Sequence, residues 1–358
     1  MLWTGDRLTY YIYGESHSDY IGVSVEGLPI HEIDIDRLSA FMDRRRAKNE
    51  VYSTKRIEPD VIEFVSGIET STLTGDRFEA RIKNTNVKSS DYNDLEGKPR
   101  PSHADYASYL RYGRTDYRGG HEFSGRMTAP LCIVGGIAKQ ILEDRGVKVL
   151  AYVHSIGEVE DISYKDSTVT SLDIENMLSR GDWAMTRQED MLSLISLVAS
   201  EGDSVGGTVE VIVEGLAGGY GGAMTDGLEG KISSLLYSIP AVKGVEFGAG
   251  FDISRMRGSE ANDELHFVDG EVVSYTNHAG GINGGISNGM PITARVAFRP
   301  TPSISRQQRT VDLIERVDTT ISIKGRHDAC IVPRTLPIVE SAVAIAILDS
   351  MEEDKICK

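Results

Sequence analysis

The clearest strand pattern in this chain is Thr208-Val209-Glu210-Val211-Ile212-Val213-Glu214, where every second residue is a valine. In the flanking stretches 187–200 and 226–238, apolar residues recur three and four positions apart, which predicts helices. Helical periodicity recurs at 36–46, 127–143 and 336–351, and strand-like alternation recurs at 8–13 and 292–298. Asp36 and Asp226 stand where N-caps are expected. Helices and strands therefore interleave along the chain, which predicts an α/β (α+β) fold.

Length and composition are those of an ordinary globular protein. The chain has 358 residues, of which 40% are hydrophobic and 26% are charged, and this excludes the disordered, collagenous and disulfide-rich classes. No linker-like run and no repeat of 20 to 50 residues interrupts it. We therefore expect a single domain over residues 1–358.

The charge distribution favours a small anionic ligand. A formal net charge of −16 argues against nucleic acid and against anionic membranes as partners, because both bind through a positive surface field. Basic residues nevertheless cluster at 44–46, at 111–118 and at Arg326. These clusters are candidate clamps for phosphate or carboxylate groups.

The cysteines and the apolar runs predict the cell compartment. Cys132, Cys330 and Cys357 are odd in number and lack CxxC spacing, so neither a disulfide framework nor a zinc site is expected. The start of the chain has no apolar signal region, and the apolar run 342–348 is far shorter than the roughly 20 residues that span a bilayer. We expect a soluble, cytoplasmic protein with no metal site.

Two histidines lie in segments that commonly build sites. His17 belongs to the predicted loop Gly14-Glu15-Ser16-His17-Ser18, and loops that follow strands often carry functional side chains. His103 follows Arg100-Pro101-Ser102, and Asp105 is placed to orient either the imidazole or the arginine. Both histidines are candidates for proton exchange near neutral pH, although a lone loop histidine is often an exposed polar residue.

Three further stretches carry features of anion sites. Ser124 and Arg126 precede a predicted helix start near Met127, where anions commonly bind, although a capped helix with a solvated charge run has the same pattern. Paired glycines at 278–289 allow close approach to a flat ligand or form a sheet corner. In Gly325-Arg326-His327-Asp328 the aspartate either holds a charge in the site or pairs with its neighbour.

The motifs of several common enzyme classes are missing from the sequence. No G-x-S-x-G, H-E-x-x-H or C-x-x-C segment occurs, so serine hydrolase and zinc chemistry lose their usual signals. The glycine-rich stretch does not match a dinucleotide-binding loop either. The residues indicate an enzyme for a phosphorylated or carboxylated small molecule, without specifying the reaction.

The order of several blocks resembles the chorismate synthase family over about residues 8–350. The blocks are Gly14-Glu15-Ser16-His17, Arg44-Arg45-Arg46, Arg56-Ile57-Glu58-Pro59-Asp60, Arg100-Pro101-Ser102-His103-Ala104-Asp105, Asp116-Tyr117-Arg118-Gly119-Gly120, Asn277-His278-Ala279-Gly280-Gly281 and Gly325-Arg326-His327-Asp328. Chance agreement over so many separate blocks is very improbable, so the resemblance supplies expectations about fold and reaction.

The resemblance implies a single β-α-β sandwich domain, assembled as a homotetramer. It implies the 1,4-elimination of phosphate and a proton from 5-enolpyruvylshikimate 3-phosphate, which gives chorismate in the shikimate pathway of aromatic amino acid biosynthesis. The reaction is redox-neutral overall and needs reduced FMN as transient electron donor and proton acceptor. No nicotinamide motif is recognisable, so it stays open whether NADPH reduces the flavin on this protein.

The resemblance also implies roles for individual residues. His17 matches the acid that assists the leaving phosphate, His103 matches the imidazole beside the flavin, and Asp328 matches the aspartate near the reactive flavin nitrogen. Arg45, Arg126 and Arg326 match arginines that bind substrate or cofactor anions. The FMN contacts fall on Ser124, Ala241, Gly284, Arg299, Pro300, Thr301, Pro302, Ser303 and Arg326.

The chain departs from the family pattern at several positions near the expected site. The departures are Ser18, Ala47, Lys48, Val51, Ser102, Glu122, Phe123, Pro240 and Arg299. They leave two rival hypotheses: a divergent relative that binds flavin or substrate without turnover, and a phosphate-sugar hydrolase that needs no flavin.

Overall fold

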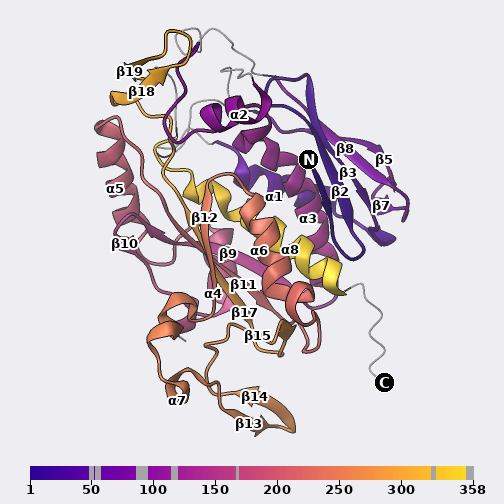
Figure 1. Ribbon diagram of the computed structural model, residues 1–358. Coiled ribbons are helices and arrows are strands. Elements are labelled where there is room, and N and C mark those ends of the chain that lie inside the picture. Colours follow the sequence, from indigo (N-terminus) through magenta and orange to yellow (C-terminus); the bar gives the residue numbers. More distant parts are fainter. Residues whose placement is uncertain are drawn as a thin grey trace.

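Two five-stranded antiparallel sheets enclose a layer of helices in the computed structural model (Figure 1). The structure describes residues 1–47, 52, 58–85, 96–113, 120–166, 169–323 and 328–351. The first sheet has the order β1 (Leu2–Thr4), β2 (Thr9–Gly14), β3 (Tyr20–Glu26), β8 (Phe78–Lys83) and β5 (Ile62–Ser66). Its core-facing side is made by alternate residues, such as Ile21, Val23 and Val25 on β3, as the period of a strand requires.

The second sheet contains the strand pattern of residues 208–214. Its order is β10 (Val159–Glu160), β9 (Lys148–Ile156), β11 (Gly207–Glu214), β17 (Ile292–Phe298) and β12 (Val242–Phe247). The valines of β11 face the helices. Glu210, on the other face, is also buried, because it is paired with Tyr152 of β9 and Arg295 of β17. The face of β11 that carries Glu210 is therefore buried and not exposed to water.

The middle layer consists of α1 (Ile35–Arg45), α3 (Thr128–Asp144), α6 (Leu228–Ser238) and α8 (Val332–Met351), as Figure 1 shows. Helix α3 is buried from Thr128 to Leu142, and α8 is buried along nearly its whole length. Helices that are apolar on all sides belong between two covering layers. The two helices pack closely at Gly135, where a Cβ atom would lie 2.1 Å from the Cβ of Ser341.

Smaller elements surround these three layers. The remaining helices are α2 (Asp105–Tyr112), α4 (Ser171–Ser179), α5 (Gln188–Ser200) and α7 (Gly258–Ala261). The remaining strands are β4 (His31–Glu32), β6 (Ile68–Glu69), β7 (Thr72–Leu73), β13 (Leu265–Val268), β14 (Glu271–Ser274), β15 (Ile282–Asn283), β16 (Ile286–Ser287), β18 (Gln308–Asp312) and β19 (Val317–Ile321). Helix α4 covers the outer face of the second sheet, where Ile174 packs with Tyr152 and Ile212.

The predicted helices and strands are present, but some of them start at other residues than predicted, for physical reasons. Helix α8 begins at Val332 rather than near 336, because it tolerates Pro333 in its first turn and Pro337 beyond it. The predicted N-caps are wrong: Asp34 caps α1 by accepting from the Arg37 N–H, and Gly227 precedes α6. Among the described residues, no helix is long and apolar enough to cross a membrane.

Candidate active site

A cavity of about 390 Å³ opens where the helical layer meets loops from both sheets. It is lined by Ser16, His17, Arg45, Arg46, Ala47, Glu58, Asp60, Arg100, His103, Gly120, Phe123, Ser124, Gly125, Arg126, Thr128, Ile239, Pro240, Ala241, Arg299, Thr301, Pro302, Ser303, Asp328, Ile331, Arg334, Thr335 and Ile338. The volume lies within the range of small-molecule pockets. The structure thus brings both predicted histidines and most of the predicted anion-binding residues to one cavity.

His17 reaches the cavity from a tight loop between β2 and β3. Gly14 begins this loop at φ 86°, and a Cβ atom there would lie 2.3 Å from the Tyr20 carbonyl oxygen. The Ser18 hydroxyl closes the loop, because it contacts the carbonyl oxygens of Glu15 at 2.9 Å and Tyr20 at 2.6 Å. His17 Nδ1 lies 2.9 Å from the hydroxyl of Ser16. The loop therefore orients the imidazole.

His103 belongs to a compact cluster with Asp105 and Arg100. The Asp105 carboxylate lies 2.7 Å from His103 Nδ1, and it also accepts two hydrogen bonds from the guanidinium of Arg100, at 2.7 and 2.8 Å. Burial alone would raise the pKa of the Asp105 carboxyl, but its hydrogen bonds to Arg100 and His103 hold that pKa below its usual range. An ionised Asp105 favours the proton on Nδ1, which leaves His103 Nε2 to exchange protons with a ligand.

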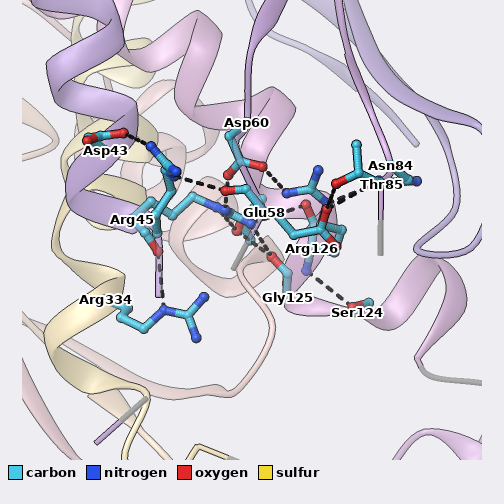
Figure 2. A network of polar contacts seen from close by, with 12 residues as sticks. Asp43, Arg45, Glu58, Asp60, Asn84, Thr85, Ser124, Gly125, Arg126 and Arg334 are labelled. Carbon is cyan, nitrogen blue, oxygen red and sulfur yellow. Dashed lines mark hydrogen bonds and ion pairs between the residues drawn. The ribbon is translucent and has the colours of Figure 1, made fainter. Parts of the chain in front are cut away.

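Two arginines share one buried carboxylate beside the histidines. Asp60 pairs through Oδ2 with Arg45 Nη1 at 2.9 Å and through Oδ1 with Arg126 Nη1, as drawn in Figure 2. Only 1% of the Asp60 side chain is exposed. Burial lowers the pKa of the Arg45 guanidinium despite this partner. The single carboxylate does not fully compensate two desolvated cations, so the site favours an added anion.

Arg126 has one nitrogen available for a ligand. Its backbone N–H donates to the N-cap hydroxyl of Ser124 at 3.2 Å, and its Nε donates to Asn84 Oδ1 at 3.0 Å. Among the residues that the structure describes, Arg126 Nη2 and Thr301 Oγ1 are buried without a hydrogen-bond partner. Both residues line the cavity. Because such atoms are costly to leave unpaired, both point to a polar ligand.

Asp328 lies in the segment that precedes α8 and is held by Arg334 of that helix. Arg334 Nη1 contacts both Asp328 carboxylate oxygens, at 2.9 and 3.0 Å, and its Nε donates to the Arg45 carbonyl oxygen at 3.2 Å. Arg326, predicted as a substrate and cofactor residue, lies outside the described residues, as do Lys48 and Val51. The pairing of Asp328 with Arg326 therefore stays a prediction.

The loop after β17 supplies another wall of the cavity. Arg299, Thr301, Pro302 and Ser303 line it together with Ala241. Arg299 donates its backbone N–H to the Ala241 carbonyl oxygen at 3.0 Å, and burial lowers the pKa of its guanidinium. Of the other predicted FMN contacts, Pro300 does not line the cavity, and Gly284 lies at the turn between β15 and β16, away from the lining.

Several site residues were not singled out from the sequence. Asp60, Asn84 and Arg334 hold predicted residues in place, and none of them directly follows an element that the sequence predicts, so local patterns carried no signal for their roles. Arg44, which the sequence groups with Arg45 as a candidate clamp, does not line the cavity, because it pairs with Glu340 on α8.

The departures from the family pattern lie around this cavity. Ala47, Phe123 and Pro240 line it, whereas Glu122 does not. Ser102 adopts φ 58°, a left-handed conformation in which the glycine of the family pattern carries no strain. Ser18 uses its hydroxyl to close the His17 loop. Two of the departures therefore have identifiable local consequences.

The lining has the charge of an anion site. Within the described ranges, the lining residues include six arginines and three carboxylates, and no group of three or more His, Cys, Asp or Glu residues has the geometry of a metal site. Two imidazoles lie among these arginines. The arrangement can bind phosphate or carboxylate oxygens and exchange protons with them.

Comparisons with known proteins give one consistent result. A family model for chorismate synthase matches residues 8–351. The chain is 43% identical over 349 residues to the chorismate synthase of Thermococcus kodakarensis, covering 97% of this chain and 96% of that relative. It is 41% identical over 339 residues to the chorismate synthase of Dehalococcoides mccartyi, covering 94% and 93%. A crystal structure of chorismate synthase superposes with a TM-score of 0.76 at 26% identity, covering 97% of this chain and 92% of that chain. The predicted α+β fold class is confirmed.

Proposed function

The chain belongs to the chorismate synthase family and is a lyase, and we propose that it converts 5-enolpyruvylshikimate 3-phosphate to chorismate using reduced FMN. The observation that supports this most is the buried Nη2 of Arg126, which has no partner among the described residues and belongs to a cavity that also contains His17 and His103. An anion bound there would share one cavity with both imidazoles.

The proposed reaction is an anti 1,4-elimination. The C–O bond to phosphate and the C–H bond on the opposite ring carbon both break, and a second ring double bond forms. Arg45 and Arg126 hold anionic groups of the substrate, because a guanidinium can grip two oxygens at once. For Arg326, only the family resemblance supports a role in binding these anionic groups. Binding by these arginines orients the substrate and keeps its charge compensated as phosphate leaves.

The two imidazoles have different roles in the proposed reaction. His17, oriented by Ser16, donates a proton to the departing phosphate, which then leaves as a weaker base. His103 has its Nδ1 engaged by Asp105, so its Nε2 is the nitrogen that responds to a neighbouring charge. Asp328, held by Arg334, adds a fixed negative charge to the same cavity.

The cavity fits a phosphorylated flavin in its donor set. Thr301 Oγ1 is buried without a partner in the described part of the chain, and the Arg299 guanidinium is partly desolvated. Ser124, Ala241, the loop from Arg299 to Ser303 and Arg326 would hold FMN, and Gly284 is included by the resemblance alone. Reduced FMN, when bound, supplies a transient electron and a proton acceptor.

Anaerobic turnover tests the proposal. Purified protein with 5-enolpyruvylshikimate 3-phosphate and dithionite-reduced FMN is expected to release chorismate and phosphate in equal amounts, and oxidised FMN should support neither. Ligand binding without product would indicate a divergent relative, and phosphate release without flavin would indicate a hydrolase. Assays with NADPH in place of dithionite would show whether the protein reduces its own flavin.

Variants at the two histidines test the assigned roles. His17→Ala and His103→Ala are each expected to lower turnover about 100- to 10,000-fold, the usual range for loss of a general acid or base. Turnover close to that of the unmodified protein would exclude the role of the histidine concerned. The family also implies a homotetramer, which sedimentation velocity tests, and we expect the enzyme to act in the cytoplasm.

A further inference from the structure

Asn84 joins two parts of the cavity that come from different segments. It follows β8 directly and is buried. Its Nδ2 donates to the Ser18 carbonyl oxygen at 2.6 Å and to the Glu15 carbonyl oxygen at 3.2 Å. Its Oδ1 accepts from Arg126 Nε at 3.0 Å, as Figure 2 shows. One amide therefore contacts both the His17 loop and Arg126, whose Nη2 has no partner in the described part of the chain.

The orientation of this amide is determined by its partners. The two carbonyl oxygens of the loop require a donor, and the Arg126 guanidinium requires an acceptor. A flipped amide would place Nδ2 against a cation and Oδ1 against two carbonyls, losing all three hydrogen bonds. The backbone N–H of Asn84 adds a further contact, to the Asp19 carbonyl oxygen at 2.9 Å. The side chain is thus locked to the loop that carries His17.

Arg126 is also locked, so that its remaining nitrogen has a defined direction. Nε is held by Asn84 and Nη1 by Asp60. Nη2 is the buried nitrogen that has no partner within the described residues. Because a guanidinium is planar, fixing two nitrogens fixes the third. The contact through Asn84 therefore sets the position of this donor relative to the backbone that flanks His17.

We propose that Asn84 is a positioning residue that keeps the proton of His17 and the Nη2 donor of Arg126 directed at the same leaving group. This inference rests on the proposed function, because it assumes that an anion binds at Arg126 while His17 acts on it. Asn84 does not line the cavity, so it acts through its two neighbours. Misplacement of reacting groups by about 1 Å costs roughly 100-fold in rate.

Asn84→Ala is the central variant, and Gln188→Ala is its matched control. Gln188 also uses both ends of its amide, accepting from the Trp183 N–H at 2.7 Å and donating to Asp182 at 3.2 Å, but unlike Asn84 it has no partner that lines the cavity. Asn84→Ala is expected to lower kcat roughly 100-fold while KM changes much less. Gln188→Ala should leave both parameters unchanged.

A double-mutant cycle separates positioning from a merely structural role. Because Asn84 acts through both His17 and Arg126, Asn84→Ala should lower kcat by a smaller factor in a His17→Ala background than in the unmodified protein. Additive effects of the two substitutions, or unchanged kcat in a folded Asn84→Ala protein, would overturn the inference. Should Asn84→Ala fail to fold, Asn84→Asp enters the same cycle, because it keeps the acceptor for Arg126 and removes the donor to the loop.

A binding measurement distinguishes failure of this inference from failure of the proposed function. Inorganic phosphate should shift the NMR signals of the His17 ring in the unmodified protein, and the shift should be much reduced in Asn84→Ala. This readout needs neither flavin nor turnover. If the protein makes no chorismate but the phosphate response depends on Asn84, the proposed function fails and the coupling stands. An identical response in both proteins overturns the coupling.

Discussion

Arg44 and Arg45, adjacent residues of α1, belong to two ion-pair clusters that have the same number of charges but differ in how completely their donors are paired. Arg44 and Lys139 share the carboxylate of Glu340, whereas Arg45 and Arg126 share that of Asp60. Both carboxylates are fully or almost fully buried, with 0% and 1% of the side chain exposed. Each cluster contains two cations and one anion, so charge count does not distinguish them.

The difference lies in how completely the donors are paired. Glu340 accepts two hydrogen bonds from Arg44 and one from Lys139, and it also accepts from the Ala151 N–H. Burial alone would lower the pKa of Arg44, but Glu340 raises it above its ordinary value, whereas burial lowers that of Arg45. Of these two clusters, only the Asp60 cluster contains a buried nitrogen that has no hydrogen-bond partner within the described residues. A fully paired cluster joins helices, and an incompletely paired one can bind a ligand.

Glu340→Ala is expected to have the largest effect, and the effect should be on stability. Removing one partner of a buried ion pair costs about 3–5 kcal/mol, since it leaves uncompensated charge. Chemical denaturation would measure the loss. Glu143→Ala is the control, because Glu143 pairs with Arg37 at the surface, where such pairs contribute about 0–1 kcal/mol. Equal losses of unfolding free energy in the two variants would show that the buried pair of Glu340 stabilises the protein no more than the surface pair of Glu143.

Arg126→Ala should have the next largest effect, and here the effect should be on activity. A charge-assisted hydrogen bond contributes roughly 1.5–3 kcal/mol, so kcat/KM is expected to fall about 10- to 100-fold. Steady-state assays with reduced FMN would measure it, with the exposed Arg37→Ala as control. If Arg126→Ala retains full kcat/KM, the unpartnered nitrogen does not bind the substrate.

Asp105→Asn tests whether the paired carboxylate of Asp105, beside the cavity, stabilises the folded protein as the carboxylate of Glu340 does. The pKa of Asp105 lies below its usual range, so its ionised form stabilises the folded protein above about pH 4, and this contribution is lost as pH falls through the lowered pKa. Asp105→Asn should therefore reduce stability at about pH 7, and its difference from the unmodified protein should shrink below about pH 4. Urea unfolding at several pH values would show this. A difference that stays constant with pH would contradict it.

Ser18→Gly should have the smallest effect. It restores the glycine of the family pattern and removes the hydroxyl contacts that close the His17 loop. A neutral hydrogen bond contributes about 1 kcal/mol, so we expect turnover to change less than about 10-fold and the protein to remain folded. Turnover assays and thermal unfolding would check both. A loss as large as that of Arg126→Ala would place Ser18 among the residues essential to the site.

Much of the fold followed from local patterns. The alternation at 208–214 and the helical periodicity at 127–143 correspond to β11 and α3, because side-chain spacing along one element is a local property. The loop residues His17 and His103 were also found from their local context, and the structure places them in one cavity. Helix starts were less predictable, since Asp34 rather than Asp36 caps α1.

The roles of Arg44 and Arg45 show what local patterns leave undetermined. They are neighbours in one basic run, and nothing in that run distinguishes them. Arg44 finds its partner 296 positions away on α8, and Arg126 reaches Asn84 and Asp60 from a different segment. Residue types, periodicity and motif order thus determined the fold class, the family resemblance and the candidate side chains. Packing of the layers determined that Arg44 pairs with Glu340 away from the cavity, and that Arg45 shares Asp60 with Arg126, whose Nη2 has no partner within the described residues. Pairing and desolvation depend on neighbours in space, and a local pattern does not contain them.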